Sequence, residues 1–308
     1  MGQKIQLLII LSVVLLFIGG CNSNTGRAVQ EIDEVNKPAP EKEIVKEELK
    51  PIEVPKPAPK PVPKAPEAKL KVDFIDVGYG DAVLFQEKEN VILVDCGRTD
   101  ESIYNYLRNH DIKEIDLLIV SVPTREHLGG CDRVMQAFSV KKVMDNGRSP
   151  NTEEYDDYDR YRGGTVYDVA KKGQLIQLGD IKIEFMSSNN RLEADNTNAI
   201  VMKLSYDDID FLLTSDCDLE CEKKLPAGLQ SEILKVSNHG SLLTTGNEFI
   251  SKVSSEVAVI SVSEKNQYNN PKQQVIDRLS KSDIYRTDLD GTVTVETNGK
   301  TYSVKTEK

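Results

Sequence analysis

The chain has 308 residues, of which 29% are charged and 39% hydrophobic; it contains no Trp and has a net charge of −11. This composition is ordinary for a globular protein, and the length allows one large domain or two small ones. The negative charge argues against a protein that binds nucleic acid mainly by general attraction to phosphates.

Residues 1–21 have the layout of a secretory signal peptide. Lys4 gives a positive start, and the apolar run from Leu7 to Ile18 is too short to span a bilayer comfortably. The following Gly19-Gly20-Cys21 resembles a lipoprotein signal ending, so we predict that Cys21 is lipidated and anchors the chain to a membrane. A plain signal peptide or an uncleaved anchor is the alternative. Each of these places the rest of the chain outside the cytoplasm.

Residues 22–69 show no apolar periodicity and hold nine of the thirteen prolines. We predict a disordered linker rich in Pro, Lys and Glu, which lifts the following domain off the membrane, although a binding motif is an alternative. The linker is neutral, which leaves a net charge of −12 on residues 70–308. That charge repels a phosphate backbone, although a local basic groove is left as an alternative.

From residue 70 onward, short apolar strands alternate with amphipathic helices, which predicts a layered α/β sandwich. The predicted strands cover 72–77, 82–85, 91–94, 117–121, 141–144, 181–186, 199–204, 211–214, 257–262, 293–296 and 302–305. The predicted helices cover 102–109, 133–138, 152–172 with a break at Gly163-Gly164, 217–224, 247–253 and 272–280.

One loop in this pattern combines several features of a functional site. Leu117 to Val120 is an apolar run expected to form a buried strand. The acid–histidine pair Glu126-His127 follows, and Gly129-Gly130 then begins a helix. A loop held between a strand and a helix is a frequent location for chemistry in α/β folds.

Six motifs carry a resemblance to a known family. They are Asp76-Val77-Gly78-Tyr79-Gly80-Asp81-Ala82, Ile92-Leu93-Val94-Asp95-Cys96-Gly97, Leu212-Leu213-Thr214-Ser215-Asp216, Leu234-Lys235-Val236-Ser237-Asn238-His239-Gly240-Ser241, Asn266-Gln267-Tyr268-Asn269-Asn270-Pro271 and Tyr285-Arg286-Thr287-Asp288. Together they resemble the extracytoplasmic hydrolase domain of the competence protein ComEC, which has a metallo-β-lactamase fold. The resemblance implies a four-layer αββα sandwich over residues 70–308, with two mixed β-sheets, helices outside and metals at a sheet edge.

The sequence departs from this family where the metal ligands are expected. The family pattern T-H-x-H-x-D-H-x-G-G has Val122 and Thr124 in place of its first two histidines, and Glu126 in place of Asp. Asn238 and Asn270 replace two further histidines. The chain has three histidines in all, and we expect one of them, His110, to lie on the surface. The remaining two cannot furnish a binuclear zinc site.

By the resemblance, Glu126, His127, Asp216 and His239 hold one Zn²⁺ or Mn²⁺ ion. The alternative is a hydrogen-bonded polar cluster without metal. The resemblance also gives structural roles near the site to Asp76, Asp81, Asp95, Gly129 and Gly130. Arg125 could contact a phosphate, but a solvated loop residue is the simpler interpretation.

Four cysteines remain besides Cys21, namely Cys96, Cys131, Cys217 and Cys221. In an oxidising compartment they allow up to two disulfides. A Cys131–Cys217 or Cys131–Cys221 bridge, a thiolate metal ligand and free buried thiols are the alternatives.

Two functional hypotheses follow, and they leave open whether the protein is an enzyme. The first is a lipid-anchored, metal-dependent phosphodiester hydrolase related to ComEC, impaired by loss of the first metal position. The second is a catalytically inactive pseudoenzyme that binds a protein partner at the cell surface. Nucleic acid is a substrate by family resemblance, but the acidic charge disfavours it. The missing ligands also argue against a drug-hydrolysing β-lactamase, because its site needs them too.

Overall fold

The computed structural model describes residues 68–187 and 198–308. The predicted signal peptide, the lipidated Cys21 and almost all of the predicted linker lie outside the described residues. Within the part of the chain that is described, every helix is too short or too polar to cross a membrane.

Eight strands form the first sheet, in the order β17-β16-β1-β2-β3-β5-β7-β8. Neighbours from β17 to β3 are antiparallel, and neighbours from β3 to β8 are parallel. The bounds are β1 Leu70–Phe74, β2 Val83–Glu87, β3 Asn90–Val94, β5 Leu117–Ile119, β7 Lys142–Asp145, β8 Val166–Val169, β16 Val293–Thr297 and β17 Tyr302–Thr306.

The second sheet has seven strands in the order β15-β14-β13-β12-β11-β10-β9, and it is also mixed: neighbours from β15 to β12 are parallel and neighbours from β12 to β9 are antiparallel. The bounds are β9 Leu175–Leu178, β10 Ile181–Phe185, β11 Met202–Tyr206, β12 Ile209–Leu213, β13 Ile233–Lys235, β14 Val257–Ile260 and β15 Asp283–Arg286. A small third sheet pairs β4 (Glu114–Ile115) with β6 (Ser139–Val140).

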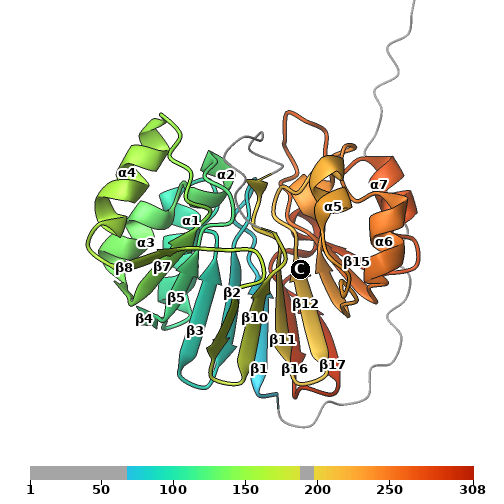
Figure 1. Cartoon of the computed structure of the whole chain (residues 1–308), viewed down its shortest axis with the longest axis horizontal. Helices are drawn as coiled ribbons and strands as arrows, with labels where there is room; N and C mark the ends of the chain where they lie inside the picture. Colours follow the sequence, from blue (N-terminus) through green and yellow to red (C-terminus); the bar gives the residue numbers. More distant parts are fainter. Residues whose placement is uncertain (1–67, 188–197) are drawn as a thin grey trace, which may run out of the picture. The chain divides into compact units, whose positions relative to one another are not determined.

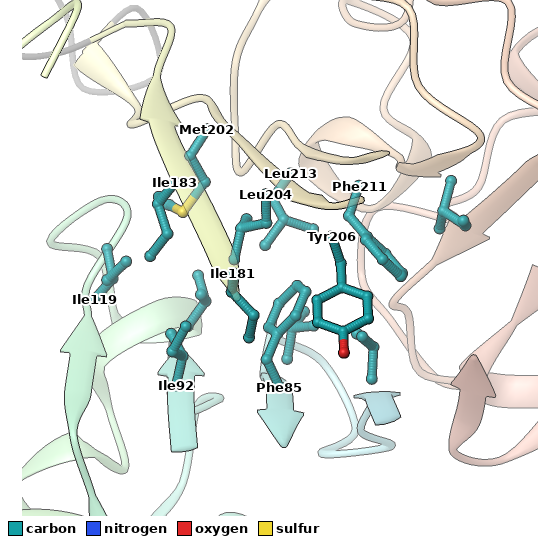
Figure 2. Packing of buried hydrophobic residues seen from close by; sticks show 14 of the residues in the cluster. Phe85, Ile92, Ile119, Ile181, Ile183, Met202, Leu204, Tyr206, Phe211 and Leu213 are labelled. Atoms are coloured by element: carbon teal, nitrogen blue, oxygen red, sulfur yellow. The ribbon is translucent and has the colours of Figure 1, made fainter. Parts of the chain in front are cut away.

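The two large sheets pack face to face through alternating side chains (Figure 2). On β2, Phe85 points into the space between the sheets and meets Phe211 of β12 edge to face, with ring centroids 5.5 Å apart. Leu84 and Leu212 point the opposite way, toward the helices. Where both faces of a strand are covered, as in β5 and β14, the strand is a continuous apolar run.

Helices cover the outer face of each sheet (Figure 1). Helices α1 (Asp100–Asn109), α3 (Cys131–Ala137) and α4 (Glu153–Arg162) pack on the first sheet, and α5 (Leu219–Lys224), α6 (Asn247–Val253) and α7 (Gln273–Arg278) pack on the second. Three short helices complete the described elements: α2 (Arg125–Leu128), η2 (Ser237–Gly240) and α8 (Thr287–Asp290). The predicted αββα sandwich is confirmed.

The prediction was wrong in one long segment. The helix expected through residue 172 ends at Arg162, and the chain continues as strand β8 after Gly163-Gly164. Tyr167 of β8 donates a hydrogen bond to Asp145 at 2.7 Å and lies under the Arg162 guanidinium, so tertiary contacts favour the strand there. Strands β4, β6, β9, β13 and β15 were not predicted either.

Candidate metal centre

Three loops at one edge of the sandwich bring His127, Asp216 and His239 together. His127 lies on α2 after strand β5, Asp216 follows β12, and His239 lies in η2 after β13. One ligating atom from each residue lies within 4.8 Å of the others, and all three side chains are buried. The sequence therefore predicted these three ligands as neighbours, and they are neighbours in space.

The His127 ring is fixed by a carboxylate behind it. Its Nδ1 lies 2.8 Å from Oδ2 of Asp95, a residue that is 2% exposed. Asp95 is held in turn by the backbone N–H of Ser121 at 2.7 Å and the Ser121 hydroxyl at 2.6 Å. A carboxylate on the far nitrogen is the usual support of a metal-binding histidine, because it sets the tautomer and the ring orientation.

The His239 ring is fixed in the same manner by a backbone carbonyl. Its Nδ1 lies 2.9 Å from the oxygen of Ser261, which can only accept, so Nδ1 carries the proton. The ring of Tyr79 covers one side, with centroids 4.4 Å apart. In the neutral ring, Nε2 is then left with a lone pair for a ligand.

The facing atoms of His127 and Asp216 have the spacing of two ligands on one ion. His127 Nε2 and Asp216 Oδ1 lie 3.2 Å apart. Both atoms are buried, and neither has a well-aligned hydrogen bond within the described residues. Tetrahedral Zn²⁺ with bonds of about 2.0–2.1 Å separates its ligands by about 3.3 Å. The donor set and its orphaned atoms therefore fit a divalent ion.

The ionisation of these groups shows the negative character of the site. Burial opposes the ionisation of Asp216, but His127, His239 and Lys235 outweigh it and lower the pKa to about 2. Burial likewise disfavours charge on His127, yet the carboxylates of Asp216 and Asp95 raise its pKa well above the usual range. The His127 ring thus lies between two carboxylates, 2.8 Å from Asp95 and 3.2 Å from Asp216. A divalent cation bound at Nε2 would take the place of a proton there, because a ligating histidine nitrogen must be deprotonated.

A buried ion pair lies directly beside this group. Lys235 is 1% exposed, and its Nζ lies 2.7 Å from Oδ2 of Asp81. The other oxygen of Asp81 has no hydrogen bond in the described part of the chain and lies 3.4 Å from His239 Nδ1. Asp81, Asp95 and His127 also form a second close group of ligand-type atoms, but the Lys235 ammonium already balances Asp81.

Glu126, the fourth predicted ligand, is not in either close group. Its carboxylate lies 4.0 Å from the Arg98 guanidinium, and its backbone oxygen accepts from the Asp81 N–H at 3.0 Å. The side chain still lines the same pocket as Asp216 and His239. Its place as a ligand stays a prediction.

The residues predicted to have structural roles lie around the centre. Asp76 accepts from the Gly78 N–H at 3.2 Å, as expected for a residue that holds the Gly78–Gly80 turn. Gly130 is needed for close approach, since a Cβ there would lie 2.6 Å from the Cys96 carbonyl oxygen. A Cβ on Gly129 would overlap the Arg98 carbonyl. Arg125 pairs with Glu154 at 3.4 Å and points to the helical layer.

The positions where the family pattern has its other histidines form a different environment. Val122 is fully buried and apolar, so it offers no ligand. Thr124 and Asn238 line a pocket of about 430 Å³, together with Asp216, His239 and Asn270. A larger cavity of about 1030 Å³ lies between α6, α7 and the β16–β17 hairpin, away from the centre, and no group of metal-type ligands in the described residues lies there.

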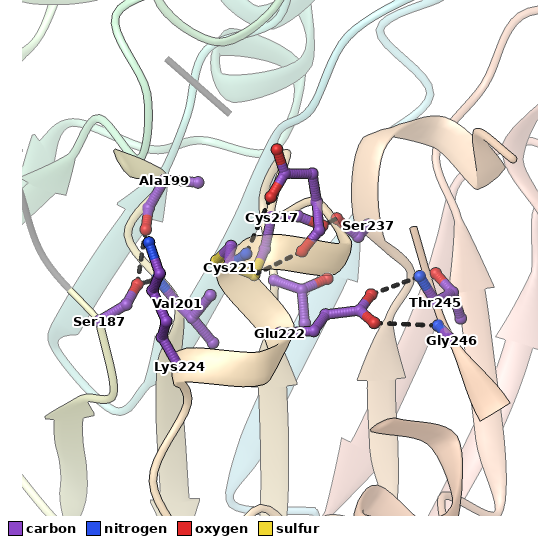
Figure 3. The surroundings of a disulfide bond; sticks show 12 residues. Ser187, Ala199, Val201, Cys217, Cys221, Glu222, Lys224, Ser237, Thr245 and Gly246 are labelled. Atoms are coloured by element: carbon purple, nitrogen blue, oxygen red, sulfur yellow. Dashed lines mark hydrogen bonds between the residues drawn. A yellow bond between two sulfur atoms is a disulfide. The ribbon is translucent and has the colours of Figure 1, made fainter. Parts of the chain in front are cut away.

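Two disulfides brace the loops that carry the acids. Cys96, directly after Asp95, is joined to Cys131, and Cys217, directly after Asp216, is joined to Cys221. The suggested Cys131–Cys217 and Cys131–Cys221 bridges were wrong, and so were free thiols and a thiolate ligand. Figure 3 shows the second bridge, with the Ser237 hydroxyl donating to the Cys217 carbonyl.

Sequence reasoning missed the polar residues that support the ligands. Ser121 and Ser215 share a hydrogen bond of 2.7 Å behind His127, and Ser261 holds His239. Lys235 was noted only as part of a motif. A lysine between the apolar residues Leu234 and Val236 was the available signal, because a buried ammonium requires an acid nearby.

Comparison with known proteins gives consistent results. A family model described as "Metallo-beta-lactamase superfamily" matches residues 75–264. The chain is 27% identical over 252 residues to "ComE operon protein 3" of Bacillus subtilis, which covers 72% of this chain and 32% of that protein. It is 26% identical over 236 residues to "Recombination protein 2" of Haemophilus influenzae, which covers 73% of this chain and 28% of that protein.

The similarity to these relatives confirms the resemblance to competence proteins, although the chain spans only about a third of their length. Among solved structures, the metallo-β-lactamase fold protein YhfI of Bacillus subtilis superposes with a TM-score of 0.53. The two sequences are 12% identical, and the superposition covers 74% of this chain and 99% of that one. This likeness supports the fold.

Proposed function

Because the chain belongs to the metallo-β-lactamase superfamily, we propose that it is an extracytoplasmic, membrane-anchored relative of the ComEC hydrolase domain that holds one divalent ion. His127, Asp216 and His239 would hold this ion, with Glu126 within reach of the same pocket. Zn²⁺ and Mn²⁺ are the candidates, since imidazole and carboxylate suit both.

The observation that carries this proposal is that both imidazole rings are held in a fixed orientation. Each ring is anchored at Nδ1, by Asp95 at 2.8 Å and by the Ser261 carbonyl at 2.9 Å. Burying two imidazoles beside an ionised Asp216 is costly unless a cation balances the group. These supports are what a metal site needs in its surroundings.

The activity that this site supports is phosphodiester hydrolysis at a reduced rate. A bound ion would supply Lewis-acid polarisation of a phosphoryl oxygen. Around it, Asp95 holds His127 in place, and Lys235 balances the charge of Asp81. The missing ligands at Val122, Thr124 and Asn238 argue against a binuclear zinc site, so the second ion that would assist a leaving group is lost.

The missing ligands also favour a second candidate, a catalytically inactive module that binds a protein partner at the cell surface. In that case the polar cluster of His127, Asp216 and His239 stabilises the loops without a metal. Nucleic acid is the less favoured partner, because residues 70–308 carry a net charge of −12.

Location outside the cytoplasm is supported by the disulfides Cys96–Cys131 and Cys217–Cys221, since such bonds persist in oxidising compartments. Lipidation of Cys21 would anchor the chain, with residues 22–69 as the tether. Radiolabelled fatty acid should enter the wild-type chain and not the Cys21→Ser variant, which should leave the membrane fraction.

The decisive measurement is the metal content of the purified full chain. We expect about one Zn²⁺ or Mn²⁺ per chain, lost in the His239→Ala variant and kept in the exposed His110→Ala control. Slow cleavage of bis(4-nitrophenyl) phosphate should follow the metal content. No bound metal, with no cleavage after addition of Zn²⁺ or Mn²⁺, would reject the hydrolase and favour the binding module.

A further inference from the structure

We propose that the pocket above the metal centre takes a ring-bearing phosphate ester the size of one nucleotide, with the phosphate at its floor and the ring against Tyr268 at its rim. This inference rests on the proposed function, because the floor includes Asp216 and His239. It adds the class of substrate and the residue that selects it.

The pocket has a polar floor and an apolar rim. Asp216, His239 and Asn270 are buried at the floor, whereas Tyr268 is 49% and Leu242 41% exposed. A ligand that fits has a charged or polar end and a flat or apolar end. Most small-molecule sites have this combination of a few fixed polar groups and an apolar wall.

Aromatic rings connect the floor to the rim. The Tyr79 ring lies 4.4 Å from the His239 ring and 5.7 Å from the Tyr268 ring, measured between centroids. Tyr268 remains half exposed and offers a ring surface for stacking.

The loop that carries Tyr268 is fixed before any ligand arrives. The Asn266 side chain accepts from the Asn270 N–H at 2.9 Å and donates to the Asn270 carbonyl at 2.9 Å. The Lys272 ammonium donates to the Tyr268 carbonyl at 2.5 Å. A stacking ring on a rigid loop loses little entropy on binding, and Lys272 adds a positive charge to the same wall.

Two residues of the pocket lining each have a buried polar atom without a partner in the described residues. One is the Oδ1 of Asn270, a residue that is 8% exposed, and the other is the hydroxyl oxygen of Thr124. Leaving such atoms unpaired is unfavourable by about 1–3 kcal/mol each. Asn270 Oδ1 can only accept, so a hydroxyl or amine donor would satisfy it and a phosphate oxygen would not.

Size and charge separate this ligand from a polynucleotide. A cavity of about 430 Å³ is in the range of pockets for single small molecules, about 300–1,000 Å³. A longer strand would have to run over a domain with a net charge of −12. A single phosphate needs only the ion and Lys272.

The test compares two probes that share a phosphate and differ in the ring. Adenosine 5′-monophosphate and ribose 5-phosphate are titrated into the purified full chain by calorimetry, and metal content is measured in each sample. We expect the base to improve affinity about tenfold, as one stacked base does. Tyr268→Ala should abolish this difference, Tyr268→Phe should keep it, and Leu243→Ala, exposed but outside the pocket lining, should change nothing.

Several outcomes would overturn the inference. They are equal affinity for the two probes, an equal loss of both in Tyr268→Ala, no binding of either probe, or a single-stranded oligonucleotide that binds much more tightly than the monophosphate. Stoichiometric metal without discrimination between the probes rejects this inference and leaves the proposed function standing. Discrimination between the probes without any bound metal rejects the proposed function and, with it, the placement of the phosphate on the ion, although Tyr268 would still select the ring.

Discussion

The cleft holds two sets of residues at the places where the family pattern has its metal ligands. The first set, here called the retained position, comprises His127, Asp216 and His239, which are all buried, and both imidazoles are anchored at Nδ1. In the other position, Val122 is fully buried as an ordinary apolar residue and Asn238 is partly exposed. The two lie in the same loops, since Asn238 is directly followed by His239.

The backbone that carries both sets is strained. Four residues at the centre adopt positive φ without being glycine: Asp95 at 61°, Ser215 at 50°, Asn238 at 44° and His239 at 54°. Each such conformation is unfavourable by about 1–2 kcal/mol. Strain of this kind persists where the surroundings enforce it. Here the strained backbone places the His239 side chain beside Asp216, whereas the Asn238 side chain has no ligand role.

The strongest test of the retained position is the removal of His127. In His127→Ala the carboxylates of Asp95 and Asp216 are left buried without the cation between them. We expect a loss of about 3–5 kcal/mol in the free energy of unfolding, measured by urea denaturation in the presence of a chelator. The exposed His110→Ala variant should change stability by less than about 0.5 kcal/mol. Equal stability of both variants would mean that His127 is neutral and merely packed.

The second set, Val122, Thr124 and Asn238, can be tested by introducing the histidines of the family pattern. The triple variant Val122→His, Thr124→His, Asn238→His should raise the metal content from one to two ions per chain. Phosphodiesterase activity should rise by about 10²–10³-fold, as expected for one added electrostatic contact to the transition state. Overpacking at buried Val122 should destabilise the fold by about 1–3 kcal/mol. Thr124→His alone is the control and should still bind one ion per chain. A triple variant that also binds one ion per chain would show that the backbone does not place the three histidines around a second ion.

The same contrast sets the limit of prediction from sequence. The succession of short apolar strands and helices after residue 70 predicted a sandwich, and Phe85 and Leu84 do face different layers. Motif order was enough to bring His127, Asp216 and His239 together. Both results depend on patterns that can be read from neighbouring residues in the sequence.

What sequence could not supply were contacts between distant segments. Nothing near Ser261 indicates that its carbonyl fixes His239, 22 residues away. The disulfide partners of Cys131 and Cys217 depend on Cα distances, which spacing alone does not determine. Glu126 looked like a ligand by its place in the motif, yet its carboxylate faces Arg98.

The support behind the retained position is open to a finer test. Asp95→Asn keeps the shape of the side chain but weakens its hold on His127 Nδ1. We expect a loss of metal affinity of about 10–100-fold, measured by competition with a fluorescent chelator. Asp73→Asn is a matched control, since Asp73 is a buried acid of the same sheet that pairs with Lys71 and Thr294 instead. If both variants lose affinity equally, the effect comes from general destabilisation.

The smallest expected effect concerns Glu222, which fastens the loop beside the retained position. Its carboxylate accepts from the N–H groups of Thr245 and Gly246 (Figure 3). Burial raises the pKa of Glu222 to about 6, against the lowering effect of those N–H groups and of Arg278. The folded chain therefore holds this proton more tightly than the unfolded chain, whose glutamate titrates near pH 4.5.

It follows that protonation of Glu222 stabilises the fold below about pH 4.5, and that this stabilisation is lost as the pH rises through about 6. The loss is on the order of 1–2 kcal/mol. In Glu222→Gln, the free energy of unfolding between these pH values should lose this downward slope, whereas Glu220→Gln, an exposed change on the same helix, should keep it. Asp216 has a pKa near 2, so it contributes no slope in this pH window. A slope that persists in Glu222→Gln would have to come from another buried acid. Asp95 is the first to test, since burial raises its pKa as well.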